Sequence, residues 1–232
     1  MVDDVPPDSS PRSRPDPSGR EDELLGAAAV ADRDALIELL AVFTHDLNNP
    51  LQTVLVLSEL ALDETMSGTE GRARAEQCLT AADRLRVLAQ AMSGLFRGRP
   101  LRAEALWERV RTLLGRRFER HGITAEITGC EPRDAMLPAL CERVVFTVAL
   151  GAIGAATTSG SRHHALEIAC APTSERISLQ ARLFTVDPAG ARTPLAFGDA
   201  HLERLAALLR LDARASHRID GAALHIDLAV GE

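Results

Sequence analysis

The segment from Phe43 to Leu51 brings an imidazole, a carboxylate and an amide together around a proline. The residues are His45, Asp46, Asn49 and Pro50. On a helix, at about 100° per residue, Asn49 lies within about 40° of His45, so the two side chains share a face. A neighbouring carboxylate such as Asp46 favours a basic, oriented imidazole. These residue types at this spacing suit a histidine that acts as a nucleophile and accepts a transferred group.

A single histidine on a helix surface is most often only solvated, so the interpretation depends on what surrounds His45. Pro50 removes one backbone hydrogen bond from a helix interior, at a cost of about 3 kcal/mol. It should also kink the helix just after the histidine. A residue this costly is rarely incidental, and together with Asp46 it favours a functional His45.

Two amphipathic stretches contain and follow this segment. From about Glu23 to Glu64, apolar residues recur at steps of three and four, which predicts a long helix. Its stripe is Leu36, Leu40, Phe43, Leu47, Leu51, Val54, Ser58 and Ala61. After a break at Gly68, a second helix has the apolar face Ala75, Leu79, Ala82, Leu85, Ala89, Met92 and Phe96.

Two helices joined by a short loop predict an αα-hairpin over residues 24–98. A single hairpin leaves its stripe without a partner layer. A second copy covers that stripe economically, so we expect a four-helix bundle across a homodimer. Residues 1–23 contain five prolines and no apolar cluster, which predicts a disordered tail.

Residues 101–232 change character, because helical and alternating segments follow one another. Helices are expected over 101–120, 139–156 and 200–211, and strands over 123–128, 165–170, 176–184 and 222–229. The pattern predicts an α+β sandwich with helices on one face of a mostly antiparallel sheet.

Composition excludes several classes of protein. The net charge is −7 and aromatic residues make up 3%, so a nucleic-acid surface is not expected. No apolar run reaches the roughly 18 residues of a membrane span, and no apolar leader opens the chain. The cysteines lack C-x-x-C spacing, as is common for reduced thiols. We therefore expect a cytoplasmic protein with neither nucleic acid nor membrane as a partner.

Other chemically able residues are expected to be structural. The pair His163-His164 has no cysteine or carboxylate at ligand spacing, so no metal site is predicted. Arg97 and Arg99, and the four arginines from Arg109 to Arg117, are expected mostly on solvated faces. An acidic partner surface could use some of them.

The order His-Asp-Leu-x-Asn-Pro that begins at His45 resembles the H-box of bacterial histidine kinases. In that family the motif lies on the first helix of a dimerisation and histidine-phosphotransfer hairpin. The resemblance covers about residues 30–98 and implies that His45 carries a phosphoryl group. It further implies that Asp46 assists proton removal, and that Asn49 helps to position a water or the partner's aspartyl phosphate.

The second half resembles that family's ATP-binding domain in its order of elements, but the residues for ATP are missing. Thr147 and Gly151 stand where the family has two asparagines, one of which helps to hold Mg²⁺. The loops expected to cradle phosphates fall at 187–192 and 197–202 and lack the family's glycines. We therefore expect a degenerate ATPase-like domain with no cofactor of its own.

An intact H-box beside a degraded ATP site resembles histidine phosphotransferases of the ChpT type. This resemblance implies a homodimeric phosphorelay enzyme that carries a phosphoryl group on His45 between receiver-domain aspartates of response regulators. A hybrid histidine kinase is a further candidate partner, and Mg²⁺ would be supplied by the receiver domain.

Two other functions stay open on the sequence alone. One is an ATP-dependent histidine kinase with a divergent nucleotide site. The other is a non-catalytic module that docks on a kinase and inhibits it. Binding of an ATP analogue separates the phosphotransferase from the kinase, and phosphate uptake from a phosphorylated receiver separates it from the docking module.

Overall fold

The computed structural model describes residues 17–62, 69–129, 135–212 and 214–229. Its first helix, α1 (Pro17–Leu62), begins inside the segment expected to be a disordered tail, residues 1–23. Proline is favoured at the first position of a helix, which accounts for this earlier start. The rest of the expected tail, residues 1–16, lies outside the described residues.

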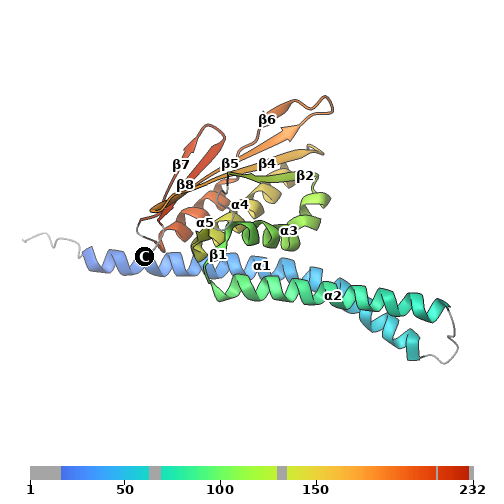
Figure 1. Cartoon of the computed structure of the whole chain (residues 1–232). Coiled ribbons are helices and arrows are strands. Elements are labelled where there is room, and N and C mark those ends of the chain that lie inside the picture. The colour runs from blue at the N-terminus through green and yellow to red at the C-terminus, as the bar shows by residue number, and fades with distance from the viewer. Residues whose placement is uncertain (1–16, 63–68, 130–134, 213, 230–232) are drawn as a thin grey trace, which may run out of the picture.

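Helix α2 (Thr69–Arg97) runs back along α1 and forms a hairpin with it (Figure 1). The α2 side chains buried in this chain are Ala81, Leu88, Met92 and Leu95. Of the apolar face expected on α2, Met92 is buried in this chain, whereas Leu79 is 70% exposed and Phe96 is 40% exposed. Helix α2 carries two neighbouring apolar stripes, and α1 covers only one of them.

The remaining elements form the second half of the chain. In order they are β1 (Leu101–Arg102), α3 (Ala103–Arg120), β2 (Ile123–Thr128), β3 (Met136–Leu137), α4 (Ala139–Thr158), β4 (His164–Pro172), β5 (Arg176–Val186), β6 (Arg192–Pro194), α5 (Asp199–Leu209), β7 (Ser216–Asp220) and β8 (Ala223–Ala229). Strands β1 and β3 pair with each other, apart from the main sheet. The main sheet has the order β2-β4-β5-β8-β7, with β6 paired to β5, and only its β2–β4 pairing is parallel.

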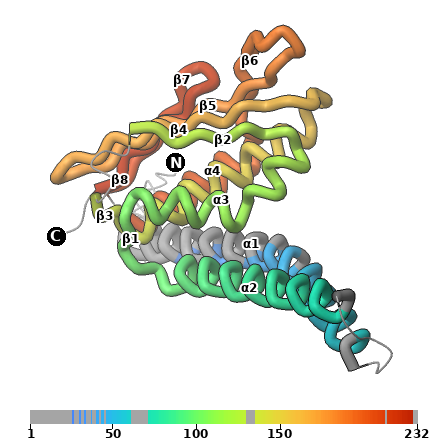
Figure 2. The backbone as a smooth tube through the Cα atoms, turned by 45° about the vertical axis from the view of Figure 1, so that its right-hand side comes forward, coloured from blue at the N-terminus to red at the C-terminus, as the bar shows by residue number. Residues whose placement is uncertain are grey.

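The chain is arranged in layers, as Figures 1 and 2 show. Helices α3, α4 and α5 cover one face of the sheet, and the hairpin lies beneath these helices. The elements from β1 to β8 are called the domain below. Helix α1 contacts α5, and α2 contacts α3, so both helices of the hairpin contact the domain. This arrangement confirms the expected α+β architecture with helices on one face of a mostly antiparallel sheet.

Helix α4 is the core of the second half. It is buried along nearly its whole length, including Cys141, Val144 and Phe146, each at 0% exposure. Among the described residues it is also the one helix long and apolar enough to cross a membrane. Because most of its surface is buried against other elements of this chain, its apolarity is explained by its place in the core.

A buried ion pair joins α3 to α4. Arg109 Nη1 lies 2.5 Å from Glu142 Oε1, and Glu142 is 1% exposed. Burial raises the pKa of the Glu142 carboxyl, while the hydrogen bond and charge of Arg109 oppose that shift. The expectation that Arg109 lies on a solvated face is therefore wrong.

The same guanidinium group lies directly against α2. A Cβ atom added at Gly94 would lie 2.6 Å from Arg109 Cζ, so a larger residue there would require the guanidinium group that pairs with Glu142 to move. Gly94 therefore allows α2 to approach α3, and the ion pair is in contact with both the hairpin and the domain.

Arg109→Ala should leave the Glu142 carboxylate buried without its counter-charge and lower the free energy of unfolding by about 3–5 kcal/mol. The double variant Arg109→Met with Glu142→Met removes both charges and should recover at least half of that loss. Urea unfolding followed by circular dichroism measures this coupling. Arg120→Ala, on the exposed end of α3, is the control and should change stability by less than about 0.5 kcal/mol. Strictly additive losses in the double variant would contradict the prediction.

Candidate functional site

The candidate residues lie on α1 where it passes under α3 and beside α2. The backbone of His45 belongs to this helix, and its side chain lies outside the described residues. Phe43 and Pro50 are buried, whereas Asn49 is exposed. The helix therefore turns one face inward, toward α2 and α3, and carries Asn49 on its accessible side.

Asp46 is turned inward, toward the domain. Its side chain is buried, and its Oδ2 atom lies 3.9 Å from Arg117 Nε on α3. The prediction that Arg117 lies on a solvated face is wrong, because its side chain is 22% exposed. No pattern in the sequence could have identified the pair, because it depends on how α3 is rotated against α1. The candidate acid thus lies at the contact between hairpin and domain.

The backbone around the histidine is helical on both sides of Pro50. Proline has no N–H group, so it cannot donate to the Asp46 carbonyl four residues earlier. Thr44 Oγ1 donates to the Leu40 carbonyl at 2.8 Å, and Thr53 Oγ1 donates to the Asn49 carbonyl at 3.1 Å. Helix α1 continues through this region, and the expected kink after His45 stays a prediction.

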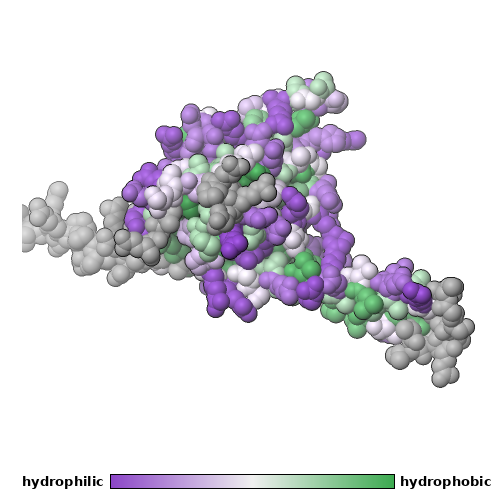
Figure 3. Space-filling model, in the orientation of Figure 1, coloured by the Kyte–Doolittle hydropathy of each residue, from purple (hydrophilic) through white to green (hydrophobic). Residues whose placement is uncertain are grey.

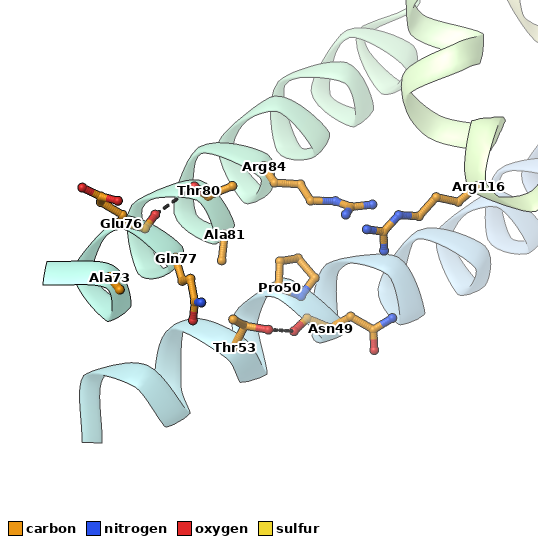
Figure 4. A pocket seen from close by; sticks show the side chains of 10 residues that line it. All are labelled: Asn49, Pro50, Thr53, Ala73, Glu76, Gln77, Thr80, Ala81, Arg84 and Arg116. Atoms are coloured by element: carbon orange, nitrogen blue, oxygen red, sulfur yellow. Dashed lines mark hydrogen bonds between the residues drawn. The ribbon is translucent and has the colours of Figure 1, made fainter. Parts of the chain in front are cut away.

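A pocket of about 570 Å³ opens beside Asn49. Its lining, drawn in Figure 4, is Asn49, Pro50, Thr53, Ala73, Glu76, Gln77, Thr80, Ala81, Arg84 and Arg116. The residues come from α1, α2 and α3. The pocket therefore lies between the hairpin and the domain, and Asn49 of the histidine motif is part of its lining.

The positions expected for ATP residues have a different environment. Gly151 on α4 is covered by α5 and the residues before it. A Cβ atom added there would lie 3.3 Å from His201 Cβ and 3.4 Å from Phe197 Cδ1. At Gly154 an added Cβ would lie 2.9 Å from His201 Cε1. Side chains of this chain therefore fill the space beside α4.

The other nucleotide positions are also engaged within the chain. The Thr147 hydroxyl donates to the Arg143 carbonyl of its own helix at 2.9 Å. Asp187 Oδ1 accepts a hydrogen bond from the Ala191 backbone N–H at 2.7 Å, which closes a tight turn between β5 and β6. Neither arrangement resembles a loop whose backbone amides point at a phosphate.

His164 and His121, outside the motif, are engaged within the second half of the chain. His164 is buried, with Nε2 2.7 Å from Ser159 Oγ and Nδ1 3.2 Å from the His121 carbonyl oxygen. Burial lowers the pKa of His121, and the charges of Arg120 and Arg117 add to this effect. Among the described side chains, no cluster of three His, Cys, Asp or Glu residues could hold a metal.

No family model and no curated protein matches the chain. Solved structures similar to it include the Acinetobacter baumannii histidine kinase AdeS, at 14% identity and TM-score 0.39, covering 80% of this chain and 96% of that one. The histidine kinase domain of the Erythrobacter litoralis EL346 blue-light-activated kinase is 8% identical, with TM-score 0.38 and coverage of 79% and 94%. A bacterial phosphotransferase is 17% identical, with TM-score 0.41 and coverage of 84% and 95%. The sequence identities and TM-scores are too low for the role of any residue to be transferred from these proteins to this chain.

Proposed function

We propose that this protein is a phosphorelay histidine phosphotransferase of the ChpT type. It carries a phosphoryl group on His45 between receiver-domain aspartates of response regulators and does not use ATP itself. The observation that carries the proposal is a contrast between two faces. The histidine motif lies beside an accessible pocket, whereas the face of α4 at Gly151 is filled by Phe197 and His201.

In the proposed reaction, the unprotonated nitrogen of the His45 imidazole attacks the phosphorus of a receiver's aspartyl phosphate. The N–P bond forms, the P–O bond breaks, and its electron pair leaves with the receiver's carboxylate. Asp46 accepts a hydrogen bond from the other ring nitrogen, which fixes the tautomer and stabilises the positive ring during transfer. Arg117 acts through Asp46, because it holds that carboxylate from the domain side.

Asn49 and the receiver complete the site in this proposal. Asn49 is the polar residue that positions a water or the incoming aspartyl phosphate. Carboxylate oxygens of the receiver hold Mg²⁺, an ion that prefers such oxygen ligands, and the reverse transfer passes the group to a second receiver. A hybrid histidine kinase is the proposed source of the phosphoryl group, and the proposed location is the cytoplasm.

We propose a homodimer held by the hairpin. Several large apolar side chains on α1 and α2 are exposed in the single chain: Leu51, Leu55, Val56, Leu79 and Val87. Figure 3 shows apolar surface on the part of the hairpin that extends beyond the domain. Covering such a surface with a second copy removes it from water.

The purified protein should neither bind an ATP analogue nor label itself with the γ-phosphate of ATP in the presence of Mg²⁺. Thr147→Asn with Gly151→Asn, which restores the family's amides, should bind no ATP either, because the new side chain at Gly151 meets His201 and Phe197. Calorimetry with the analogue and a radiolabelled autophosphorylation assay test both statements. Labelling of His45 from ATP would support the divergent kinase instead.

His45→Ala should abolish phosphate uptake from a phosphorylated receiver and change stability by less than about 1 kcal/mol. Asn49→Ala should keep the acceptor but slow transfer or phosphate loss. Asp46→Asn should give an intermediate rate, because it keeps the shape and loses the charge. A time course of labelled phosphate, with circular dichroism on each variant, measures these effects. Acid-labile phosphate on folded His45→Ala protein would assign the carrier to another residue.

Leu79→Glu should convert the proposed dimer to a monomer, because it buries a charge in the hairpin interface. Ile219→Glu is the control, since Ile219 is similarly apolar and exposed but lies on β7. Light scattering coupled to size-exclusion chromatography at micromolar concentration distinguishes the two states. A wild-type monomer, or dissociation by the β7 variant as well, would argue against the hairpin interface.

A further inference from the structure

Two arginine side chains converge on the pocket beside Asn49 from different elements. Arg84 extends from α2 and Arg116 from α3, and Figure 4 shows their guanidinium groups pointing toward one another near Pro50. Within the described part of the chain, neither guanidinium group forms an ion pair. Two like charges held together without a counter-charge repel each other, and they create a local positive potential.

The neighbouring charges on α2 are already engaged. Glu76, the acid in the pocket lining, pairs with Arg72 at 3.3 Å on its own helix. Asp83, the residue directly before Arg84, pairs with Arg86 at 2.7 Å. Neither acid is therefore placed to neutralise Arg84.

The neighbouring arginines on α3 have partners within the chain. Arg109 pairs with Glu142, Arg117 pairs with Asp46, and Arg111 lies over the Trp107 ring with Cζ 5.5 Å from its centroid. Of the four arginines between Arg109 and Arg117, the described structure thus leaves Arg116 for a partner outside the chain. In a protein of net charge −7, this positive site is an exception to the overall charge.

The chemistry of the pocket favours a protein segment over a free ion. Its lining includes Pro50, Ala73 and Ala81, which offer apolar contact. The hydroxyls of Thr53 and Thr80 already donate to helix carbonyls. The lining also includes the amides of Asn49 and Gln77, but its charged donors are the two guanidinium groups. A guanidinium fork matches a carboxylate in a bidentate geometry. A protein surface with carboxylates beside apolar side chains therefore fits both the guanidinium groups and the apolar lining of this pocket.

We propose that Arg84 and Arg116 form a docking site for carboxylates on an acidic face of the partner receiver domain. The inference rests on the proposed function, because it names the surface through which the phosphoryl donor or acceptor is held. The pocket begins at Asn49, about 6 Å along the helix from His45 at 1.5 Å per residue. A receiver held there has its reacting aspartate close to the histidine.

The test compares two double charge reversals in the full-length protein. Arg84→Glu with Arg116→Glu changes the site, and Arg97→Glu with Arg120→Glu makes the same change in net charge on exposed positions of α2 and α3. Binding of unphosphorylated receiver domains from the same genome is measured by calorimetry. At low salt the site variant should bind at least about tenfold more weakly, because like charges then face each other. The control variant should change affinity by less than about threefold, as expected for exposed charges away from the contact.

Two further measurements keep the result interpretable. Arg84→Gln with Arg116→Gln removes both positive charges without adding negative ones. This variant is used instead of the reversal if circular dichroism shows that the reversal unfolds the chain. The difference between site and control variants should shrink as salt is raised to about 0.5 M, because exposed pairs are screened. Equal weakening in both variants, or receivers that never bind the wild type, would overturn the proposal.

Inorganic phosphate separates the receiver's carboxylates from a free anion. At matched ionic strength, about 10 mM phosphate should displace a receiver no better than chloride, because screening depends on ionic strength. Strong displacement by phosphate alone would instead define a phosphate site and overturn the carboxylate assignment. His45→Ala should bind receivers as the wild type does. Arginine-dependent binding without phosphate uptake by the wild type would therefore refute the proposed function and leave this docking site standing.

Discussion

The buried ion pair between Arg109 and Glu142 joins α3 to α4 and, together with the buried apolar stripe of α3, holds the rotation on which the candidate site depends. Gly94 lies against the same guanidinium group, so the pair also sets how closely α2 approaches the domain. Arg116 lies about two helical turns beyond Arg109 and therefore on nearly the same face of α3. Arg117, the next residue, is turned toward Asp46. The packing of α3 around this ion pair thus determines which arginine reaches the pocket and which one lies beside the candidate acid.

Elements with a single buried face could be predicted from the sequence. Strands β4, β5 and β8 alternate between buried and less buried residues over long stretches, and α3 and α5 have clear apolar stripes. Strand β7 is exposed at every position, so it has no alternation to detect, and β1, β3 and β6 are only two or three residues long. These strands could not be predicted because they are too short or too exposed to show an alternation of apolar and polar residues.

The candidate site shows the same division between local and tertiary information. His45, Asp46 and Asn49 could be proposed from the sequence because their types and spacing along one helix suit the proposed chemistry. The sequence could suggest that an acidic partner uses some of the arginines from Arg109 to Arg117, but not which ones, because adjacent residues on a helix differ by about 100° and packing decides where each points. Which side chains of α2 pack against α1 could not be predicted for the same reason. Helix α2 has two apolar stripes, and the position of α1 determines which of them is buried within the chain.

Small residues on α4 determine how closely α5 packs against it. Gly151 and Gly154 let His201 lie against the helix, so α5 packs on α4 with side chains in the space between them. Interiors packed at this density have little room for an added group, and even one methylene is felt. Under the proposed function, the domain keeps its architecture because α3 must be held in place by α4. In that proposal, the domain serves to position the arginines of α3 against the hairpin and does not serve to bind a nucleotide.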